Sequence, residues 1–355
     1  MPATPRVLVT PLDWGLGHAT RCVPVIRELQ RQGAEPVLAT AGRAAAYLKA
    51  EFPGLEHILF PAYDIRYPTA NMYWNMGLQA VKLLRVIRQE HELLQAVIRQ
   101  RNVRAVISDN RFGCFSSLAP SVFITHQSNL AVPSFPAWWA ANKANQFFMR
   151  QYREWWLPDY KPEGFSGALS RPLAQLPYRC LGILSRFTPM QCDPTYDVLA
   201  LLSGPEPQRS RLEQVLVQQL RFLPHRVLLV QGKTESYEEF EAAPNIKVVS
   251  FLNQAGLQQA LTASKQVVCR SGYSSLMDLA ATGKKALLIP TPGQPEQQYL
   301  AMHLQSRGIC PFQHQHSVNL TQGLARIPQY RGFSPPMKTG EGLEAAVRAL
   351  LGRVA

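Results

Sequence analysis

A glycine-containing turn with a single histidine follows the first apolar run of the sequence and is the first candidate for chemistry. The turn lies in PLDWGLGHATRC (11–22), directly after RVLVT. Imidazole titrates near neutral pH, so a histidine in such a turn can act as a general base. We expect His18 to take this role, with Asp13 as its orienting partner or as an alternative base. Gly15 and Gly17 would let the backbone pass close to a bound ligand.

Polar side chains also follow two later apolar runs, in SDNRFG (108–113) and THQSN (125–129). Because the carboxyl ends of parallel strands lie on one edge of a sheet, we expect these loops to converge with His18. Arg21, on the first turn of the helix after His18, is expected to bind a phosphate or to lie in solvent. The residues expected to hold a second substrate are Asp109, Asn110, Arg111, Thr125 and His126.

A further candidate site lies in CRSGYSSLMDLAATG (269–283), where an expected strand passes directly into a helix. Ser271 can cap that helix and Gly272 permits close approach, so unpaired N–H groups at a positive dipole end would face outward. Arg270 adds a positive charge, and the combination favours an anionic ligand. Asp278, on the same helix, can accept hydrogen bonds from both hydroxyls of a ribose. For the Ser-Gly pair alone, a well-capped helix is the simpler explanation.

Two more loops of the second half carry polar groups that a turn does not need. In TPGQPEQQYL (291–300), Gln297 and Gln298 begin a helix and can bind the hydroxyls of a sugar. In LLSGPEPQRS (201–210), we expect Ser203 and Gly204 to contact the same ligand. All these residues follow expected strands, so they too would meet at one edge of a sheet.

Short β-branched runs alternate with helical patterns along both halves of the chain, which predicts parallel sheets with helical crossovers. In the first half we expect strands over 6–10, 35–40, 56–61, 104–109 and 121–126, and helices over 19–32, 43–51 and 76–100. In the second half we expect strands over 196–204, 226–232, 246–251, 266–272 and 285–290, and helices over 208–221, 254–263 and 273–282. A proline-rich stretch separates the halves. The sequence therefore predicts an α/β chain with two Rossmann-like, doubly wound domains, 1–190 and 191–355, that face an interdomain cleft.

The segment from Cys269 to Leu304 resembles the carboxyl-terminal domain of family 28 glycosyltransferases, which include the N-acetylglucosaminyltransferase that makes lipid II. The shared elements are CRSG, an acidic residue followed by LAATG, then ALLIP, and a Gln-Gln pair after a short loop. The opening GLGH turn is similar to the amino-terminal turn of enzymes with the GT-B fold. The resemblance implies the GT-B fold and the transfer of a hexose or N-acetylhexosamine from a nucleotide sugar, with UDP as the expected nucleotide.

Carried over residue by residue, the resemblance implies that Ser271 and Gly272 face the diphosphate and that Asp278 takes the ribose. Gln297 and Gln298 would contact the donor sugar, and the backbone of Leu252 would meet the base. The expected donor-binding residues are Gly15, Gly17, Ser203, Gly204, Leu252, Arg270, Ser271, Gly272, Asp278, Gln297 and Gln298. His18 would deprotonate the acceptor hydroxyl, and transfer would proceed with inversion.

The same residues are compatible with another reaction on the same fold. GHATRC is also similar to the turn of UDP-sugar hydrolases of nonulosonic acid synthesis, so hydrolysis or epimerisation of a UDP-sugar on the same fold is the alternative. We expect no metal and no cofactor beyond the nucleotide sugar, because no D-x-D motif ends a strand and the pair His314 and His316 has no third ligand nearby. The net charge of +13 is spread over the chain without a recognisable module, so we expect no nucleic-acid partner.

The composition also bears on location. The cysteines form no C-x-x-C pair and no signal peptide precedes the first strand, so we expect a cytoplasmic protein, and no apolar run is long enough to span a membrane. The segment 133–160 holds four of the six tryptophans beside basic residues, and the helix at 82–104 is basic. The segment 133–160 either contacts the inner face of the plasma membrane and admits a lipid-linked acceptor or packs in the core, and the helix 82–104 either contacts the membrane or is solvated. Trp155 and Trp156 fit a buried strand better.

Overall fold

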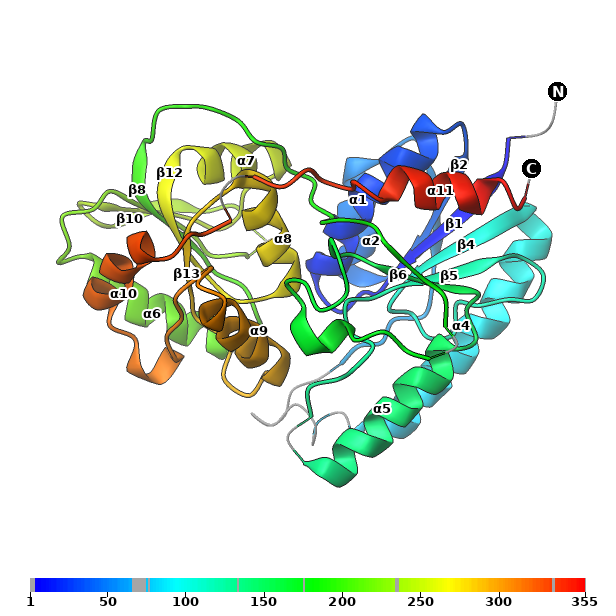
Figure 1. Ribbon diagram of the computed structural model, residues 1–355. Coiled ribbons are helices and arrows are strands. Elements are labelled where there is room, and N and C mark those ends of the chain that lie inside the picture. The colour runs from blue at the N-terminus through cyan, green and yellow to red at the C-terminus, as the bar shows by residue number, and fades with distance from the viewer. Residues whose placement is uncertain are drawn as a thin grey trace. The chain divides into compact units, whose positions relative to one another are not determined.

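The chain forms two compact units, shown in a computed structural model that describes residues 4–65, 75, 77–132, 134–174, 176–233, 236–333 and 336–354 (Figure 1). Unit 1 comprises Met1–Arg186 and Thr339–Ala355, and unit 2 comprises Phe187–Lys338. The chain thus leaves unit 1 and later returns to it, whereas the sequence predicts a single crossing near residue 190.

Unit 1 is built on a seven-stranded sheet of order β3-β2-β1-β4-β5-β6-β7, in which all neighbours pair in parallel. The strands are β1 (Arg6–Pro11), β2 (Glu35–Thr40), β3 (Glu56–Leu59), β4 (Val103–Asp109), β5 (Ser121–Ile124), β6 (Glu154–Leu157) and β7 (Tyr178–Cys180). The helices are α1 (Leu16–Arg31), α2 (Gly42–Glu51), α4 (Ala80–Arg101), α5 (Phe135–Met149), α11 (Leu343–Leu351) and the 3-10 turn Gly167–Ser170. The strand order reverses between β1 and β4, whose last residues Pro11 and Asp109 are paired in register. The loops after these two strands therefore leave the sheet at the switch point where such folds bind ligands.

The core of unit 1 explains why the end of the chain belongs to it. On α1, Cys22, Ile26 and Leu29 recur at helical spacing and are fully buried against the sheet. From α11, Leu343 and Val347 are buried in the same core. The apolar side of α11 therefore completes the cover of α1, and this places residues 339–355 in unit 1 rather than in the second domain.

Unit 2 contains a six-stranded sheet of order β10-β11-β9-β8-β12-β13, in which only β10 runs antiparallel to its neighbour among the described strands. The strands are β8 (Tyr196–Leu201), β9 (Val227–Val230), β10 (Glu239–Ala243), β11 (Ile246–Val249), β12 (Ser264–Cys269) and β13 (Ala286–Leu288). The helices are α6 (Gln208–Leu220), α7 (Gln254–Thr262), α8 (Tyr273–Thr282), α9 (Pro295–Ser306), α10 (Leu320–Arg326) and the 3-10 turns Gln315–Ser317 and Ile327–Gln329. Its strand order reverses between β8 and β12, so this unit repeats the switch-point arrangement of unit 1.

The predicted α/β class and the two doubly wound sheets are confirmed. Trp155 and Trp156 lie in β6 with 0% and 1% of their surface exposed, as expected for a buried strand. The edge strand β10 was not expected. In the described part of the chain no helix is both long enough and apolar enough to cross a membrane.

Candidate active site

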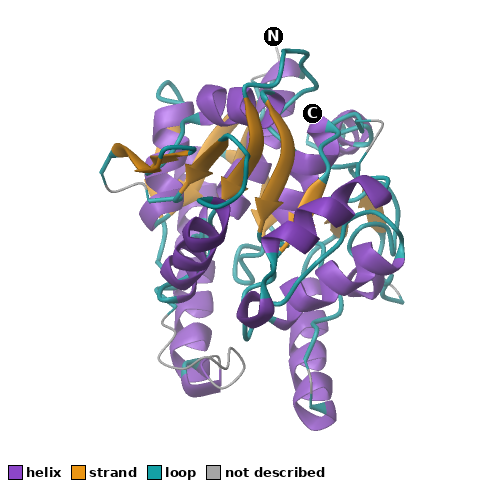
Figure 2. Ribbon diagram, turned by 90° about the vertical axis from the view of Figure 1, so that its left-hand side faces the viewer, coloured by secondary structure: helices purple, strands orange, loops and turns teal. Residues whose placement is uncertain are grey.

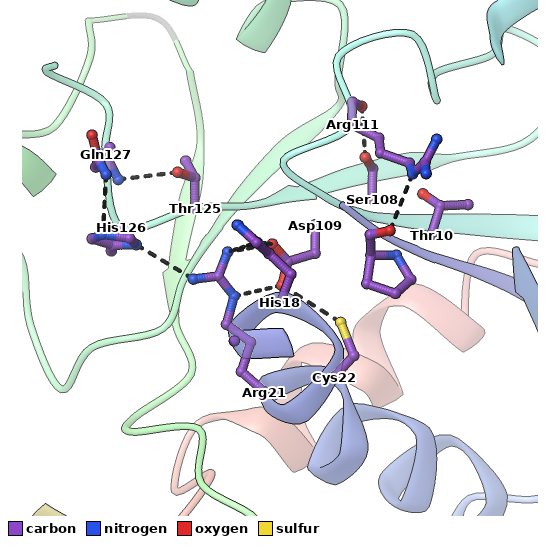
Figure 3. Close-up of polar contacts among 12 residues, drawn as sticks. Thr10, His18, Arg21, Cys22, Ser108, Asp109, Arg111, Thr125, His126 and Gln127 are labelled. Carbon is purple, nitrogen blue, oxygen red and sulfur yellow. Dashed lines mark hydrogen bonds and ion pairs between the residues drawn. The ribbon is translucent and has the colours of Figure 1, made fainter. Parts of the chain in front are cut away.

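His18 lies on the first turn of α1, directly after the end of β1. The preceding Gly15 has φ 95°, a conformation that glycine adopts readily and other residues rarely do, and it lets the chain turn sharply from strand to helix. The imidazole is 18% exposed, and its Nδ1 lies 2.8 Å from Oδ1 of Asp109, the last residue of β4. The switch point of the sheet therefore brings a histidine and a carboxylate together (Figure 3).

The Asp109 carboxylate is completely buried and is held mainly by Arg21. Nε of Arg21 donates to Oδ2 at 2.5 Å, Nη2 donates to Oδ1, and Sγ of Cys22 lies 3.5 Å from Oδ2. Burial by itself would raise the pKa of Asp109, but Arg21 and His18 together hold it well below its usual range. Asp109 is therefore ionised at neutral pH.

The imidazole of His18 is neutral at neutral pH. Burial lowers its pKa and the nearby Arg21 charge lowers it further, against a smaller opposing effect of Asp109. Nη2 of Arg21 also lies 2.8 Å from Nδ1 of His18. A neutral Nδ1 can either accept from Arg21 or donate to Asp109, and not both. Because Nη2 of Arg21 already donates to Oδ1 of Asp109, we assign the ring proton to Nδ1, donated to the same carboxylate, so that Nε2 keeps its lone pair. Such an imidazole is suited to accept a proton at Nε2.

Arg21 connects this pair to the loop that follows β5. Its side chain is 3% exposed, and Nη1 lies 3.4 Å from Nδ1 of His126, whose Nε2 is 3.3 Å from Nε2 of Gln127. Arg21 is therefore a structural part of the site, held between two histidines and a carboxylate. It neither lies in solvent nor stands free to bind a phosphate, the two roles expected for it. Its spacing of three residues from His18, on one face of a helix, is the signal that could have indicated this.

The structure corrects two roles expected near this turn. Asp13 does not orient His18: its Oδ1 accepts from Nη2 of Arg111 at 3.1 Å, and its Oδ2 accepts from the Tyr63 amide at 3.1 Å. The orienting carboxylate is Asp109. Arg111 is fully buried, so its side chain cannot contact an acceptor.

The other residues expected to hold the acceptor are mostly enclosed. Thr125 is 1% exposed and its Oγ1 accepts from the Gln127 amide at 3.0 Å, while His126 is 4% exposed. Asn110 is partly exposed and takes the left-handed conformation with φ 58°. The role of Asn110 in binding an acceptor stays a prediction.

In unit 2 only residues 270–272 separate the end of β12 from the amino terminus of α8. Gly272 is the N-cap residue, and no side chain caps the first turn of the helix. A Cβ placed on Gly272 would meet open space, so a ligand could approach the backbone here. Ser271 is buried, and its Oγ donates to the carbonyl of Gln297 at 2.7 Å. The positive end of the α8 dipole can therefore face an anion at Gly272, while the Ser271 hydroxyl is used inside the fold.

Arg270 was expected to face a ligand, but the structure places it inside the fold. Its side chain is fully buried, and its Nη atoms donate to the carbonyls of Ile289 (3.1 Å), Pro290 (3.3 Å) and Gln208 (2.9 Å). Burial lowers its pKa to about 10. The guanidinium joins the ends of β12 and β13 to the start of α6, and its charge stays behind the amino terminus of α8.

A chain of contacts joins the loops after β8, β12 and β13. Oε1 of Gln297 accepts from the Thr291 amide at 2.9 Å, and its Nε2 donates to Oε1 of Gln294 at 2.5 Å. Oγ1 of Thr291 is buried and has no hydrogen-bond partner among the described residues. A Cβ placed on Gly204, which has φ 98°, would lie 3.3 Å from that oxygen. Thr291 was not predicted from the sequence, and the Gln297 amide is engaged in its own loop.

The remaining expected donor residues have accessible surface. Ser203 and Gly204 are exposed, while Leu252, Asp278 and Gln298 are partly exposed. Asp278 lies in the middle of α8, and Leu252 directly precedes Asn253, which caps α7 by accepting from the Gly256 amide at 2.9 Å. These positions border the carboxyl-end loops of the unit 2 sheet, and their contacts with a nucleotide sugar stay predictions.

Similarity to solved structures defines the class of protein. The chain matches the kitacinnamycin glycotransferase (TM-score 0.71, 14% identity, 100% of both chains) and the calicheamicin glycosyltransferase CalG4 (TM-score 0.70, 16% identity, 100% of both chains). It also matches MurG of Acinetobacter baumannii, with a TM-score of 0.61 and 14% identity over 98% of this chain and 100% of that one. These neighbours have the GT-B fold of glycosyltransferases, and the predicted fold is thereby confirmed.

Sequence similarity shows which glycosyltransferases the chain resembles. Residues 210–331 match the glycosyltransferase family 28 C-terminal domain. Over 339 residues, 88% of each chain, the protein is 22% identical to the UDP-N-acetylglucosamine--N-acetylmuramyl-(pentapeptide) pyrophosphoryl-undecaprenol N-acetylglucosamine transferase of Haemophilus ducreyi. It is 37% identical over 104 residues to the enzyme of the same name from Methylobacterium radiotolerans, 29% of this chain and 25% of that one. The chain is a glycosyltransferase that carries a family 28 C-terminal domain.

Proposed function

We propose that the chain transfers a hexose or N-acetylhexosamine from a nucleotide sugar, with UDP as the nucleotide, to a hydroxyl group of a lipid-linked cell-envelope acceptor. The reaction inverts the anomeric centre and needs no metal. The observation that carries this proposal is the neutral, partly exposed imidazole of His18, whose Nδ1 lies 2.8 Å from the buried and ionised Asp109.

The proposed reaction is a single displacement. Nε2 of His18 accepts the proton of the acceptor hydroxyl as its oxygen attacks the anomeric carbon of the donor. The bond between that carbon and the nucleotide diphosphate breaks on the opposite face, which inverts the configuration. Asp109 stabilises the imidazolium that forms, because its ionised carboxylate lies 2.8 Å from Nδ1 and accepts the proton there in the assigned tautomer.

The donor is assigned to unit 2. The positive end of the α8 dipole and the open space at Gly272 face the diphosphate, and the buried Arg270 adds positive charge behind them. The orphan hydroxyl of Thr291, next to Gly204, offers one more hydrogen bond. Asp278 and Gln298 are proposed to bind the ribose and the sugar, and the similarity to the Haemophilus N-acetylglucosamine transferase supports UDP-N-acetylglucosamine as the first donor to test.

A membrane-borne acceptor is supported by the surface of two helices in unit 1. On α5, Phe135, Trp139 and Phe147 are 74%, 55% and 62% exposed, and on α4 Val81 is 73% exposed. Nζ of Lys143 lies 5.9 Å from the ring centre of Trp139, so a cation accompanies the exposed aromatic group. Both helices reach the lower end of unit 1 in the two views (Figures 1 and 2). Aromatic and basic side chains together favour the surface of an anionic bilayer, and we place the enzyme on the inner face of the plasma membrane.

The proposal is tested by measuring nucleotide release and product formation. UDP, GDP and dTDP are first compared by thermal shift, because a ligand of the folded state raises its melting temperature. UDP-N-acetylglucosamine is then supplied with and without a polyprenyl-pyrophosphoryl sugar in detergent. UDP release that requires this acceptor, with a β-linked product from the α-linked donor, supports the proposal. Equally fast formation of free sugar without acceptor, or of an epimer, overturns the transferase assignment and favours the hydrolase or epimerase alternative.

A further inference from the structure

A buried ion cluster lies beside the active site without belonging to it. Glu90, in the middle of α4, is completely buried. Its Oε1 accepts from the Gly113 amide at 2.6 Å and from the Tyr63 hydroxyl at 2.8 Å, and its Oε2 accepts from Nη1 of Arg111 at 3.1 Å. Arg111 donates in turn to Asp13 at 3.1 Å. The reaction proposed above uses none of these groups.

The cluster fixes the backbone on both sides of the site. Arg111 also donates to the carbonyls of Pro11 (3.1 Å) and Pro61 (3.0 Å). Pro11 ends β1, and the turn that follows it leads to His18, while Arg111 itself follows Asp109 by two residues. The amide of Leu12 donates to the Asp109 carbonyl at 2.9 Å. The backbone segments before His18 and after Asp109 are therefore joined to each other and to α4 through one guanidinium.

The space around Glu90 leaves little freedom for this arrangement. A Cβ on Gly113 would lie 2.5 Å from Cγ of Glu90 and 2.2 Å from the carbonyl oxygen of Ile87, so only glycine fits there. The Arg111 guanidinium lies 5.5 Å from the ring centre of Tyr63. A tightly enclosed charge of this kind moves only with its surroundings, because interiors are close-packed.

We propose that Glu90, acting through Arg111, is a positioning residue that sets the separation between His18 and Asp109 and couples α4 to the active site. The inference rests on the proposed function for its effect on turnover, although its effect on geometry does not depend on that function. A shift of about one ångström between reacting groups can lower a rate by roughly 100-fold.

The pKa of His18 reports on its separation from Asp109, because charged and titratable groups face the imidazole. They are Asp109 from β4, Arg21 from α1 and, through Arg21, His126 from the loop after β5. Asp109 raises the pKa of His18, and Arg21 and His126 lower it. If Asp109 moves away, its charge no longer stabilises the protonated form of His18, and the pKa of His18 falls further.

The experiment compares Glu90→Gln with a matched control, Glu154→Gln. Glu154 is also a buried carboxylate of unit 1, 4% exposed, with ion pairs to Arg179 and Arg353, but it does not contact this cluster. The pKa of His18 is measured by NMR of labelled imidazoles, with the signal assigned by its loss in His18→Gln, and kcat and KM are measured in parallel. For Glu90→Gln we expect a lower His18 pKa and a kcat reduced roughly 10- to 100-fold, with an unchanged KM for the nucleotide sugar.

The outcomes separate the inference from the proposed function. A Glu90→Gln variant that is folded, keeps the wild-type His18 pKa and loses only thermal stability, as Glu154→Gln should, overturns the positioning role. If Glu90→Gln does not fold, Tyr63→Phe removes one hydrogen bond to the same carboxylate and should shift the His18 pKa in the same direction by less. A shifted pKa in a protein without transferase activity supports the positioning role and refutes the proposed reaction.

Discussion

Replacing Asp109 by asparagine tests the active-site chemistry most directly. The substitution keeps the shape of the side chain and removes the charge that holds His18 and Arg21. An amide that presents its NH2 group to Nδ1 of His18 makes that nitrogen an acceptor, so the proton moves to Nε2 and the base is lost. We expect kcat to fall by roughly 100- to 10,000-fold, the range for losing a general base or its correct tautomer.

The same substitution should destabilise unit 1. The Arg21 side chain is 3% exposed and would lose its carboxylate partner, and an unpaired buried charge costs about 3–5 kcal/mol. The pKa of Asp109 is lowered on folding, so its contribution is present above the unfolded value of about 3.9 and is lost as the pH falls below it. The difference in unfolding free energy between wild type and variant should therefore be constant near neutral pH and shrink in acid.

Urea unfolding followed by tryptophan fluorescence measures this effect, because all six tryptophans belong to unit 1. Turnover is measured at saturating donor, with UDP affinity as the control, since the donor is assigned to unit 2. An Asp109→Asn variant with near-normal kcat and normal UDP affinity would refute the role of Asp109 in orienting the base. A stability difference that grows in acid would refute the assignment of a buried, ionised carboxylate.

Further changes test single groups. His18→Ala should lower kcat by roughly 100- to 10,000-fold and leave UDP affinity unchanged in calorimetry; equal losses in both would argue against a base. In wild type, log kcat should decline in acid only below about pH 6.5, the ordinary histidine value, because burial and Arg21 lower the pKa of His18; a decline beginning above it would contradict a lowered pKa. Asp278→Ala should weaken UDP binding, and unchanged affinity would remove this residue from the donor site. Thr291→Val loses no hydrogen bond within the described fold, so the melting temperature should hold while UDP binding weakens; a large drop in melting temperature would show that its hydroxyl has a structural partner.

The fold was predictable because its signals are local and repeated. Apolar strands that end in polar loops, separated by amphipathic helices, specify parallel sheets, and the run around Cys269 indicates the family 28 C-terminal domain that the family match confirms. The edge strand β10 was missed, since its residues Glu239 and Glu241 lack the apolar character of a central strand. The packing of α11 against unit 1 was not predicted, because the sequence of an amphipathic helix does not show which core the helix covers.

The location of the site could be predicted from the sequence, but the roles of its residues could be predicted only in part. His18 and Asp109 were both singled out, because both stand at strand ends on the switch point of one sheet. Sequence could not show that Arg111 and Arg270 are enclosed by backbone carbonyls and carboxylates, since burial of an arginine depends on partners far away along the chain. The assignment of the orienting carboxylate to Asp13 failed for the same reason: the residue nearer in sequence faces Arg111, and the residue nearer in space comes from β4.

The return of α11 to unit 1 has a consequence for synthesis on the ribosome. Unit 2 lies wholly between the two segments of unit 1, so its residues are all translated before Thr339. Throughout the synthesis of unit 2 the α1 side of the first sheet therefore still lacks Leu343 and Val347. A nascent or truncated chain that ends near residue 338 would expose this apolar surface, and it is at this stage that a chaperone would be needed most.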